Sequence, residues 1–273
     1  MALLSCAVQY NARIENNYYL KYKGLYLKYQ KCTKDSESDV LTAFYTDEEE
    51  NEVYKKVMEF AYAYAYYRDY ECLISDYLQN DVLDFYSMAK YPGGFVVNRK
   101  LYMEKKEYPW DLPPITLISS KKQSDLLQLY TRANSNQDPI FKCLFFFHTI
   151  VYPSKNDNTV IPTYINNYLA ENIIPQHLKY LLTYLLENSA FGDIKNNDFG
   201  NHVKNIRNSI AHIIRNSQDD ANLRLDNIEQ NRYLGSLARV LKEIAKYKLD
   251  TEYDFCKLAD KSIISAYDPV NYK

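Results

Sequence analysis

The chain has 273 residues, of which 33 are Lys or Arg and 35 are Asp or Glu, so its formal net charge is −2. A hydrophobic fraction of 47% is enough to form a core and excludes wholesale disorder, and the near-zero net charge excludes a polybasic nucleic-acid coat. At about 150 residues per domain, this length predicts one or two domains.

Residue usage excludes several further classes of protein. Only six glycines are present, and neither GxGxxG nor GxxxxGK[ST] occurs, which sets aside Rossmann dehydrogenases, P-loop NTPases and protein kinases. The five cysteines form no CxxC or CxxH pair, so we expect no zinc site and free thiols in a reducing cytoplasm. The 29 tyrosines have two interpretations, stacking on sugars or bases and amphipathic core packing, and we favour the second.

No segment predicts membrane insertion or export. The longest strongly apolar stretch, Cys143–Tyr152, is shorter than the roughly 20 residues that span a bilayer. The start Met1–Cys6 resembles a lipoprotein signal only faintly, because it has no cationic region and its apolar run stops at Gln9. We therefore expect a cytoplasmic protein with no membrane partner.

The first third of the chain predicts short strands and then one long helix. Alternation from Val8 to Ile14 indicates a strand, and Tyr18–Tyr22 and Leu25–Tyr29 around Gly24 indicate a hairpin. Beyond the acidic residues 47–50, apolar side chains at spacings of three and four predict a helix from about 48 to 78. Alternation within Ala61–Tyr66 leaves a strand open as the alternative there.

A domain boundary is predicted at Pro109–Pro114, the stiffest and least helical segment of the chain. A short strand is expected before it, at Phe95–Met103. We therefore expect a mixed α+β region at 1–114 with a few short strands, serving regulation or recognition, and a helical domain at 115–273. The predicted fold class is mainly α.

The region after this boundary predicts an all-α bundle. A helix begins near Ser124, and Asp138-Pro139 supplies an N-cap and first turn for a helix at Ile140–Tyr152. This second helix is apolar almost all round, which is typical of the centre of a bundle. Further helices are predicted at Thr163–Glu171, Pro175–Asn188, Phe199–Ser217 and Asn227–Leu249, with a loop near Gly192.

The predicted helix at Asn201–Ser217 carries the candidate site. Apolar residues form one stripe that we expect to be buried: Val203, Ile206, Ile210 and Ile213. Polar residues form another stripe: Lys204, Asn208, His212 and Arg215. Asn208 and His212 are one turn apart on one face, and Arg207 lies about 100° round from Asn208.

These side chains suit an anionic substrate. Arginine offers a planar fork of donors to two phosphate oxygens, asparagine orients, and histidine exchanges a proton near pH 7. No carboxylate lies between 201 and 215, whereas a metal-dependent nuclease usually needs one, so we expect no metal or other cofactor. Without a metal to activate water, the natural nucleophile is the 2′-OH, which RNA has and DNA lacks.

Arg207-Asn208-Ser209-Ile210-Ala211-His212 resembles the R-N-x-x-x-H motif of the HEPN superfamily of helical domains. The resemblance covers about 120–250, and residues 1–110 match no family. It implies a metal-independent endoribonuclease in which two protomers form one composite site. Arg207 would bind the scissile phosphate, Asn208 would orient and His212 would transfer protons. Many relatives carry an acidic residue at the end of the preceding apolar helix, and His148–Tyr152 has none.

The resemblance also implies partners and a role. RNA, either tRNA or mRNA, would be the substrate, the chain would be a homodimer, and an antitoxin or regulatory partner would control a toxin or anti-phage effector. Two alternatives remain: a non-catalytic HEPN-type dimer that binds RNA, a nucleotide or a partner protein, and an ordinary surface helix.

Accessory residues complete the candidate site. Lys204, Arg215 and His202 are the expected RNA- and phosphate-binding residues, with His202 lining the site. His148 is interpreted as a core histidine and His177 as a surface residue at a helix start. Residues 195–248 hold ten Lys or Arg against six Asp or Glu, so this part of the chain is locally basic.

Overall fold

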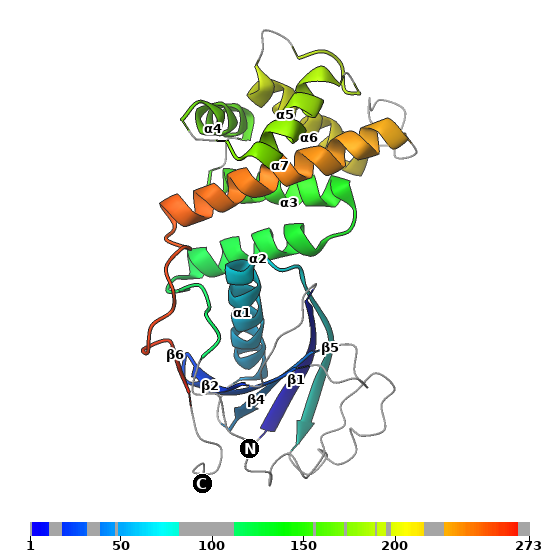
Figure 1. The fold of residues 1–273 in the computed structure, drawn as a ribbon. Coiled ribbons are helices and arrows are strands. Elements are labelled where there is room, and N and C mark those ends of the chain that lie inside the picture. Colours follow the sequence, from blue (N-terminus) through cyan, green and yellow to red (C-terminus); the bar gives the residue numbers. More distant parts are fainter. Residues whose placement is uncertain are drawn as a thin grey trace. The chain divides into compact units, whose positions relative to one another are not determined.

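A computed structural model describes residues 2–10, 18–31, 39–46, 49–81, 112–154, 157–171, 174–188, 190–194, 198–215 and 227–266. The chain divides into two compact units. The first comprises Met1–Leu127 and Phe255–Lys273, and the second comprises Gln128–Asp254. Strands belong to the first unit and most helices to the second, so the expected combination of a small sheet with a larger helical part is confirmed (Figure 1).

The first unit contains a six-stranded antiparallel sheet with the order β5-β1-β4-β3-β2-β6. Its strands are β1 (Ala2–Tyr10), β2 (Tyr18–Tyr22), β3 (Leu25–Gln30), β4 (Asp39–Tyr45), β5 (Cys72–Asp81) and β6 (Ile264–Ala266). The predicted hairpin is confirmed as β2–β3. Lys23 and Gly24, its two loop residues, both have positive φ, at 46° and 85°, as a tight two-residue hairpin loop requires.

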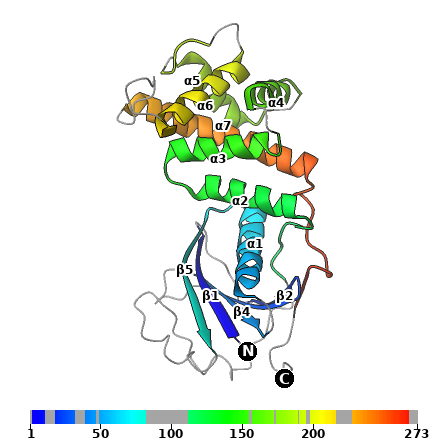
Figure 2. The same cartoon turned by 180° about the vertical axis from the view of Figure 1, so that it is seen from behind.

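Tyrosines line the contact between one face of the sheet and helix α1 (Glu50–Arg68), which Figures 1 and 2 show against that face. Phe60 meets Tyr22 and Tyr29 edge-on, with ring centroids 5.5 and 6.4 Å apart. The Tyr29 hydroxyl donates to Asp39 Oδ2 at 2.8 Å. These tyrosines combine a buried ring with a satisfied hydroxyl, which supports the core interpretation for this part of the chain.

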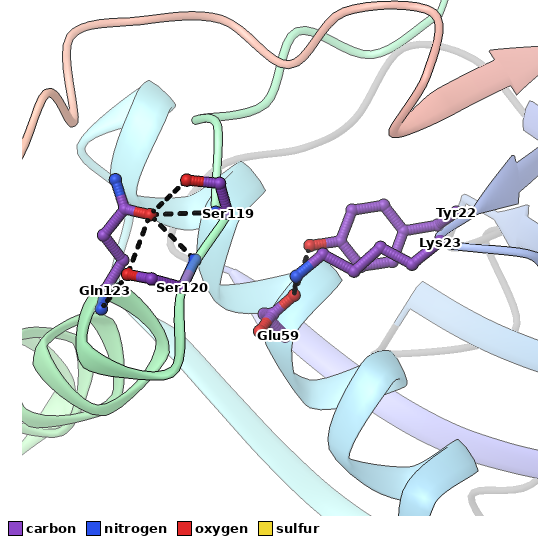
Figure 3. A network of polar contacts seen from close by, with 6 residues as sticks. All are labelled: Tyr22, Lys23, Glu59, Ser119, Ser120 and Gln123. Carbon is purple, nitrogen blue, oxygen red and sulfur yellow. Dashed lines mark hydrogen bonds and ion pairs between the residues drawn. The ribbon is translucent and has the colours of Figure 1, made fainter.

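A polar cluster joins the hairpin loop to α1 (Figure 3). The Tyr22 hydroxyl donates to Glu59 Oε1 at 2.6 Å, and the Lys23 ammonium forms an ion pair with the same oxygen. Burial and the adjacent Glu59 carboxylate raise the pKa of Tyr22. The cluster therefore connects the hairpin loop to α1.

The predicted helix over 48–78 is confirmed as far as Arg68 and is wrong over residues 69–78. α1 ends at Arg68, and Asp69 adopts a left-handed conformation with φ of 56°, its N–H bonded to the last turn. The following residues form β5, which pairs with β1 along its length. Ala61–Tyr66 belongs to the helix, so the alternative strand there is also excluded. Tertiary pairing with β1 determines this change, and no local pattern reveals it.

The predicted domain boundary at Pro109–Pro114 also differs from the structure, which divides within α2 (Lys121–Ser135). Thr116 N–H bonds to Ala63 O of α1, and the Leu117 and Ala259 N–H groups bond to Lys257 O and Ile115 O. These contacts attach both the segment before α2 and the C-terminal segment to the sheet unit. The expected strand from Val8 to Ile14 is confirmed over Val8–Tyr10, which belong to β1, whereas its residues 11–14 and the expected strand at Phe95–Met103 lie outside the described residues.

Helix α2 begins with a reciprocal cap, also drawn in Figure 3. Gln123 N–H donates to Ser120 Oγ at 3.2 Å, and Gln123 Oε1 accepts from the Ser120 and Ser119 N–H groups at 3.1 and 2.8 Å. This S-x-x-Q arrangement satisfies N–H groups at the helix start that have no partner within the helix.

The second unit is all-α throughout its described residues, as predicted. After the end of α2 come α3 (Pro139–Val151), α4 (Asp157–Glu171), α5 (Gln176–Glu187), α6 (Phe199–Arg215) and α7 (Ile228–Glu252). α3 contacts α7, α4 and α6, which confirms its central position. Asp138 caps α3 by accepting from Ile140 N–H at 2.8 Å, and the buried Lys248 ammonium donates to two carbonyl oxygens at its end.

Candidate functional site

Helix α6 has one side that is buried and another that is partly accessible to solvent. Val203, Ile206 and Ile210 are each no more than 1% exposed, and the helix contacts α4 and α3. The expected apolar stripe is therefore confirmed over these three residues. The side chain of Ile213 lies outside the described ones.

The first two motif residues are half-buried on α6 and contact each other. Arg207 Nη1 donates to Asn208 Oδ1 at 3.2 Å. Lys204 lies one turn earlier, also half-buried, and its ammonium donates to Asn201 Oδ1 at 2.9 Å. A guanidinium and an ammonium thus lie on neighbouring turns outside the apolar stripe, where they can interact with an anionic group.

His212 and Arg215 lie in the last turns of α6, and their side chains fall outside the described ones. Because the backbone is helical from Phe199 to Arg215, His212 follows Asn208 by about one turn along the axis. The backbone spacing that the motif needs is therefore present.

A network of polar contacts positions the start of α6 against α4. Asp198 occupies the N-cap position, and its Oδ1 accepts from the Asn201 N–H and the Asn166 side-chain amide, both at 2.9 Å. Asn166 Oδ1 accepts in turn from the Gly200 N–H at 2.9 Å. These hydrogen bonds hold the pKa of the Asp198 carboxyl below its usual value.

Gly200 is required by a close approach between α6 and α4. A Cβ at this position would lie 2.5 Å from Pro162 O and 2.8 Å from Asn166 Oδ1. Only glycine therefore allows α6 to lie this near the α4 backbone. Sequence reasoning missed Asn166, Asp198 and Gly200; an Asp before an amphipathic helix and a glycine inside its first turn were the available signals.

The predicted phosphate contact of His202 is wrong, because this side chain is buried, with 7% of its surface exposed. Its Nε2 lies 3.0 Å from the Tyr233 hydroxyl, which donates to Leu185 O at 3.3 Å. Since the hydroxyl hydrogen is used there, we assign the ring hydrogen to Nε2. Burial lowers the pKa of His202, which favours its neutral form. It links α6 to α7.

The two remaining histidines have opposite outcomes. His148 is exposed on α3, so its interpretation as a core histidine is wrong. The apolar character of α3 concealed this, because Phe141 is also 43% exposed and one side of the helix reaches solvent. His177 is exposed at the start of α5, as predicted.

Two other kinds of site are absent from the described part of the chain. No group of three or more His, Cys, Asp or Glu residues there could hold a metal ion. None of the helices described is both long and apolar enough to cross a membrane.

Comparison with known proteins adds no relative. No family model, curated protein or solved structure matches this chain. The functional interpretation therefore depends on the residues of α6 and their surroundings.

Proposed function

We propose that this chain is a metal-independent endoribonuclease of the HEPN type. The observation that supports the proposal is the arrangement of Arg207, Asn208 and His212 on a helix whose apolar side is buried while Arg207 and Asn208 remain partly accessible. The anchored start of α6 adds support, because a site held on a rigid helix keeps its groups in a constant geometry.

In the proposed reaction, the 2′-OH of a ribose attacks the adjacent phosphorus and the 5′-oxygen of the next nucleotide leaves. The products are a 2′,3′-cyclic phosphate and a 5′-OH. Arg207 stabilises the charge that develops on the phosphorane oxygens. Asn208 orients the groups around it, and His212 transfers a proton near pH 7.

The proposal includes a homodimer. Attack by the 2′-OH is helped by a base for the nucleophile and an acid for the leaving oxygen, and one motif supplies one histidine. Two copies related by a two-fold axis supply a pair of histidines and a pair of arginines, and two-fold dimers are the commonest oligomers. We expect the two α6 helices to face each other across one cleft.

RNA cleavage by the purified chain in EDTA tests the chemistry. We expect RNA to be cut and DNA of the same sequence to be spared. His212→Ala should lower the rate at least ~10²-fold, as expected for loss of general acid–base catalysis, and Arg207→Ala should lower it similarly. His177→Ala and Arg132→Ala remove the same side-chain types from exposed positions on α5 and α2 and should leave the rate unchanged.

Three results would contradict this mechanism: activity that is lost in EDTA, a 5′-phosphate product, or His212→Ala with the wild-type rate. RNA binding without cleavage would favour the non-catalytic alternative. For the dimer, excess His212→Ala mixed into wild type should inhibit more than dilution alone. A monomer by light scattering that cuts at full rate would exclude the composite site.

The proposed biological role is a toxin or anti-phage effector under the control of an antitoxin or regulatory partner. Induced expression should then arrest bacterial growth, whereas expression of His212→Ala at the same level should not. Equal growth of the two strains would remove the support for this role.

A further inference from the structure

Helix α5 has more apolar side chains than its own unit covers. Seven of its twelve residues are aliphatic or aromatic: Leu178, Tyr180, Leu181, Leu182, Tyr184, Leu185 and Leu186. Only Leu178 and Leu185 are buried, whereas Tyr180 is 68% and Leu186 54% exposed. The helix contacts α7, and Figures 1 and 2 show it at an edge of the second unit. A surface helix normally turns its apolar stripe toward the core, so α5 has apolar surface in excess of that need.

The exposed side of α5 is organised around one row of residues. Lys179, Thr183 and Glu187 are four positions apart and all exposed, so they lie one above another along the helix. Tyr180 lies on one flank of this row and Leu186 on the other, because successive residues are about 100° apart around the axis. The row therefore has a positive end, a negative end and an apolar flank on each side.

This row is complementary to itself when it is reversed. Helices commonly pack with their rows of residues four apart aligned, and a two-fold axis near Thr183 would align the row with a reversed copy of itself. Lys179 of each copy then lies opposite Glu187 of the other, which gives two ion pairs. The two Tyr180 side chains share one flank of the contact, and the two Leu186 side chains share the other. Thr183, the shortest side chain of the row, lies at the centre.

The charges of the row are available for such a contact. Neither the Lys179 ammonium nor the Glu187 carboxylate forms an ion pair within the described part of the chain. One lysine and one glutamate give the row no net charge, so it has no electrostatic attraction for a phosphate backbone. Opposite charges at equal distances from Thr183 match a reversed copy of the same row.

We propose that this α5 face, defined by Lys179, Tyr180, Thr183, Leu186 and Glu187, binds a second copy of the chain in an antiparallel two-fold contact. A helix of twelve residues is about 18 Å long. One side of such a helix offers less than the roughly 800 Å² per partner of a standard stable interface. We therefore expect a reversible dimer with a Kd on the order of 10 μM.

The proposal goes beyond the α6 chemistry, because it names a surface that joins two copies and requires no cleavage. Its test measures mass in the absence of RNA, so the result does not depend on whether the chain is a ribonuclease. A variant that is monomeric but cleaves RNA at the full rate would contradict the composite α6 site and leave the α5 contact intact. The two proposals can therefore fail separately.

Sedimentation equilibrium of the full-length chain at low salt, from about 1 to 300 μM, is the test. Lys179→Glu turns two attractive pairs into two repulsive ones and should weaken the dimer about 10- to 100-fold. Leu186→Ser removes apolar contact on both copies and should weaken it by a similar factor. Lys179→Glu combined with Glu187→Lys exchanges the two charges and should restore the wild-type Kd.

Matched controls come from exposed positions of the first unit. The Lys55 side chain on α1 is 66% exposed, and Leu258 is 50% exposed. Lys55→Glu makes the same change in net charge as Lys179→Glu, and Leu258→Ser makes the same apolar-to-polar change as Leu186→Ser. Both controls should dimerise like wild type.

A chain that stays monomeric over the whole concentration range would overturn the proposal. A dimer with the same Kd in wild type, Lys179→Glu and Leu186→Ser would also overturn it, because the copies would then meet through another surface. If Lys179→Glu dissociates the dimer but the exchanged pair does not restore it, the antiparallel pairing is wrong. The variants change exposed side chains, and circular dichroism checks that each is folded.

Discussion

Replacing Gly200 with alanine tests how α6 is positioned for its proposed chemistry. The new Cβ would lie 2.5 Å from Pro162 O and 2.8 Å from Pro162 Cα. These are backbone atoms inside α4, so a helix must shift to relieve the overlap. Overpacking typically costs about 1–3 kcal/mol, and two backbone contacts below 3 Å place this variant near the upper end. Alanine regains up to about 1 kcal/mol of helix propensity, so we expect a net loss of about 2 kcal/mol.

Gly235 provides the matched control, because it lies inside α7 with no atom within 4 Å of an added Cβ. Gly235→Ala should raise the free energy of unfolding by about 1 kcal/mol through helix propensity alone. The difference between the variants, about 3 kcal/mol, then measures the close approach at Gly200. Urea unfolding followed by far-ultraviolet circular dichroism gives both values. A Gly200→Ala chain at least as stable as wild type would refute this account of the α4–α6 contact.

Two further predictions concern stability. Burial lowers the pKa of His202, so folding favours its neutral form. Its contribution to the free energy of unfolding is complete above the unfolded pKa of about 6.5 and is lost as the pH falls from 6.5 through the folded pKa. His202→Gln keeps a donor for Tyr233 but does not titrate. As the pH falls from 7.5 to 5.5, its free energy of unfolding should therefore decrease less than that of wild type. An equal decrease in the two chains, measured by urea unfolding at each pH, would exclude this role. Gln123→Ala removes the reciprocal cap of α2 and should lower the unfolding free energy by about 1 kcal/mol, whereas Gln123→Glu should retain most of it.

Local pattern predicted the elements whose formation is local. The hairpin around Gly24, the capped helix after Asp138 and the amphipathic α6 each follow from turn residues, a cap or a helical period within a few positions. β5 and β6 could not be predicted in this way, because each is a strand through pairing with a partner more than 60 residues away. Residues 255–266 also belong to the sheet unit through contacts with residues far away in the sequence. The observed boundary therefore differs from the predicted one.

The candidate site shows the same division between local and distant causes. His202 precedes Ile206 and Ile210 by four and eight residues, so the helical period itself places it on the buried stripe. This period therefore argues against a phosphate contact for His202. The contact between Asn166 and Gly200 joins residues 34 apart, and no sequence pattern relates them. A glycine inside a helix in a chain with only six glycines was the sole local indication of a close approach.

The residues of α6 make different kinetic contributions to the proposed reaction. Lys204 is half-buried one turn before Arg207 and is expected to bind phosphate, an interaction that the bound substrate and the transition state share. Lys204→Gln should therefore raise KM while kcat stays near the wild-type value. His212→Ala acts only on the chemical step, so kcat should fall while oligonucleotide affinity is retained. If Lys204→Gln instead lowers kcat and leaves KM unchanged, Lys204 acts in the transition state rather than in substrate binding.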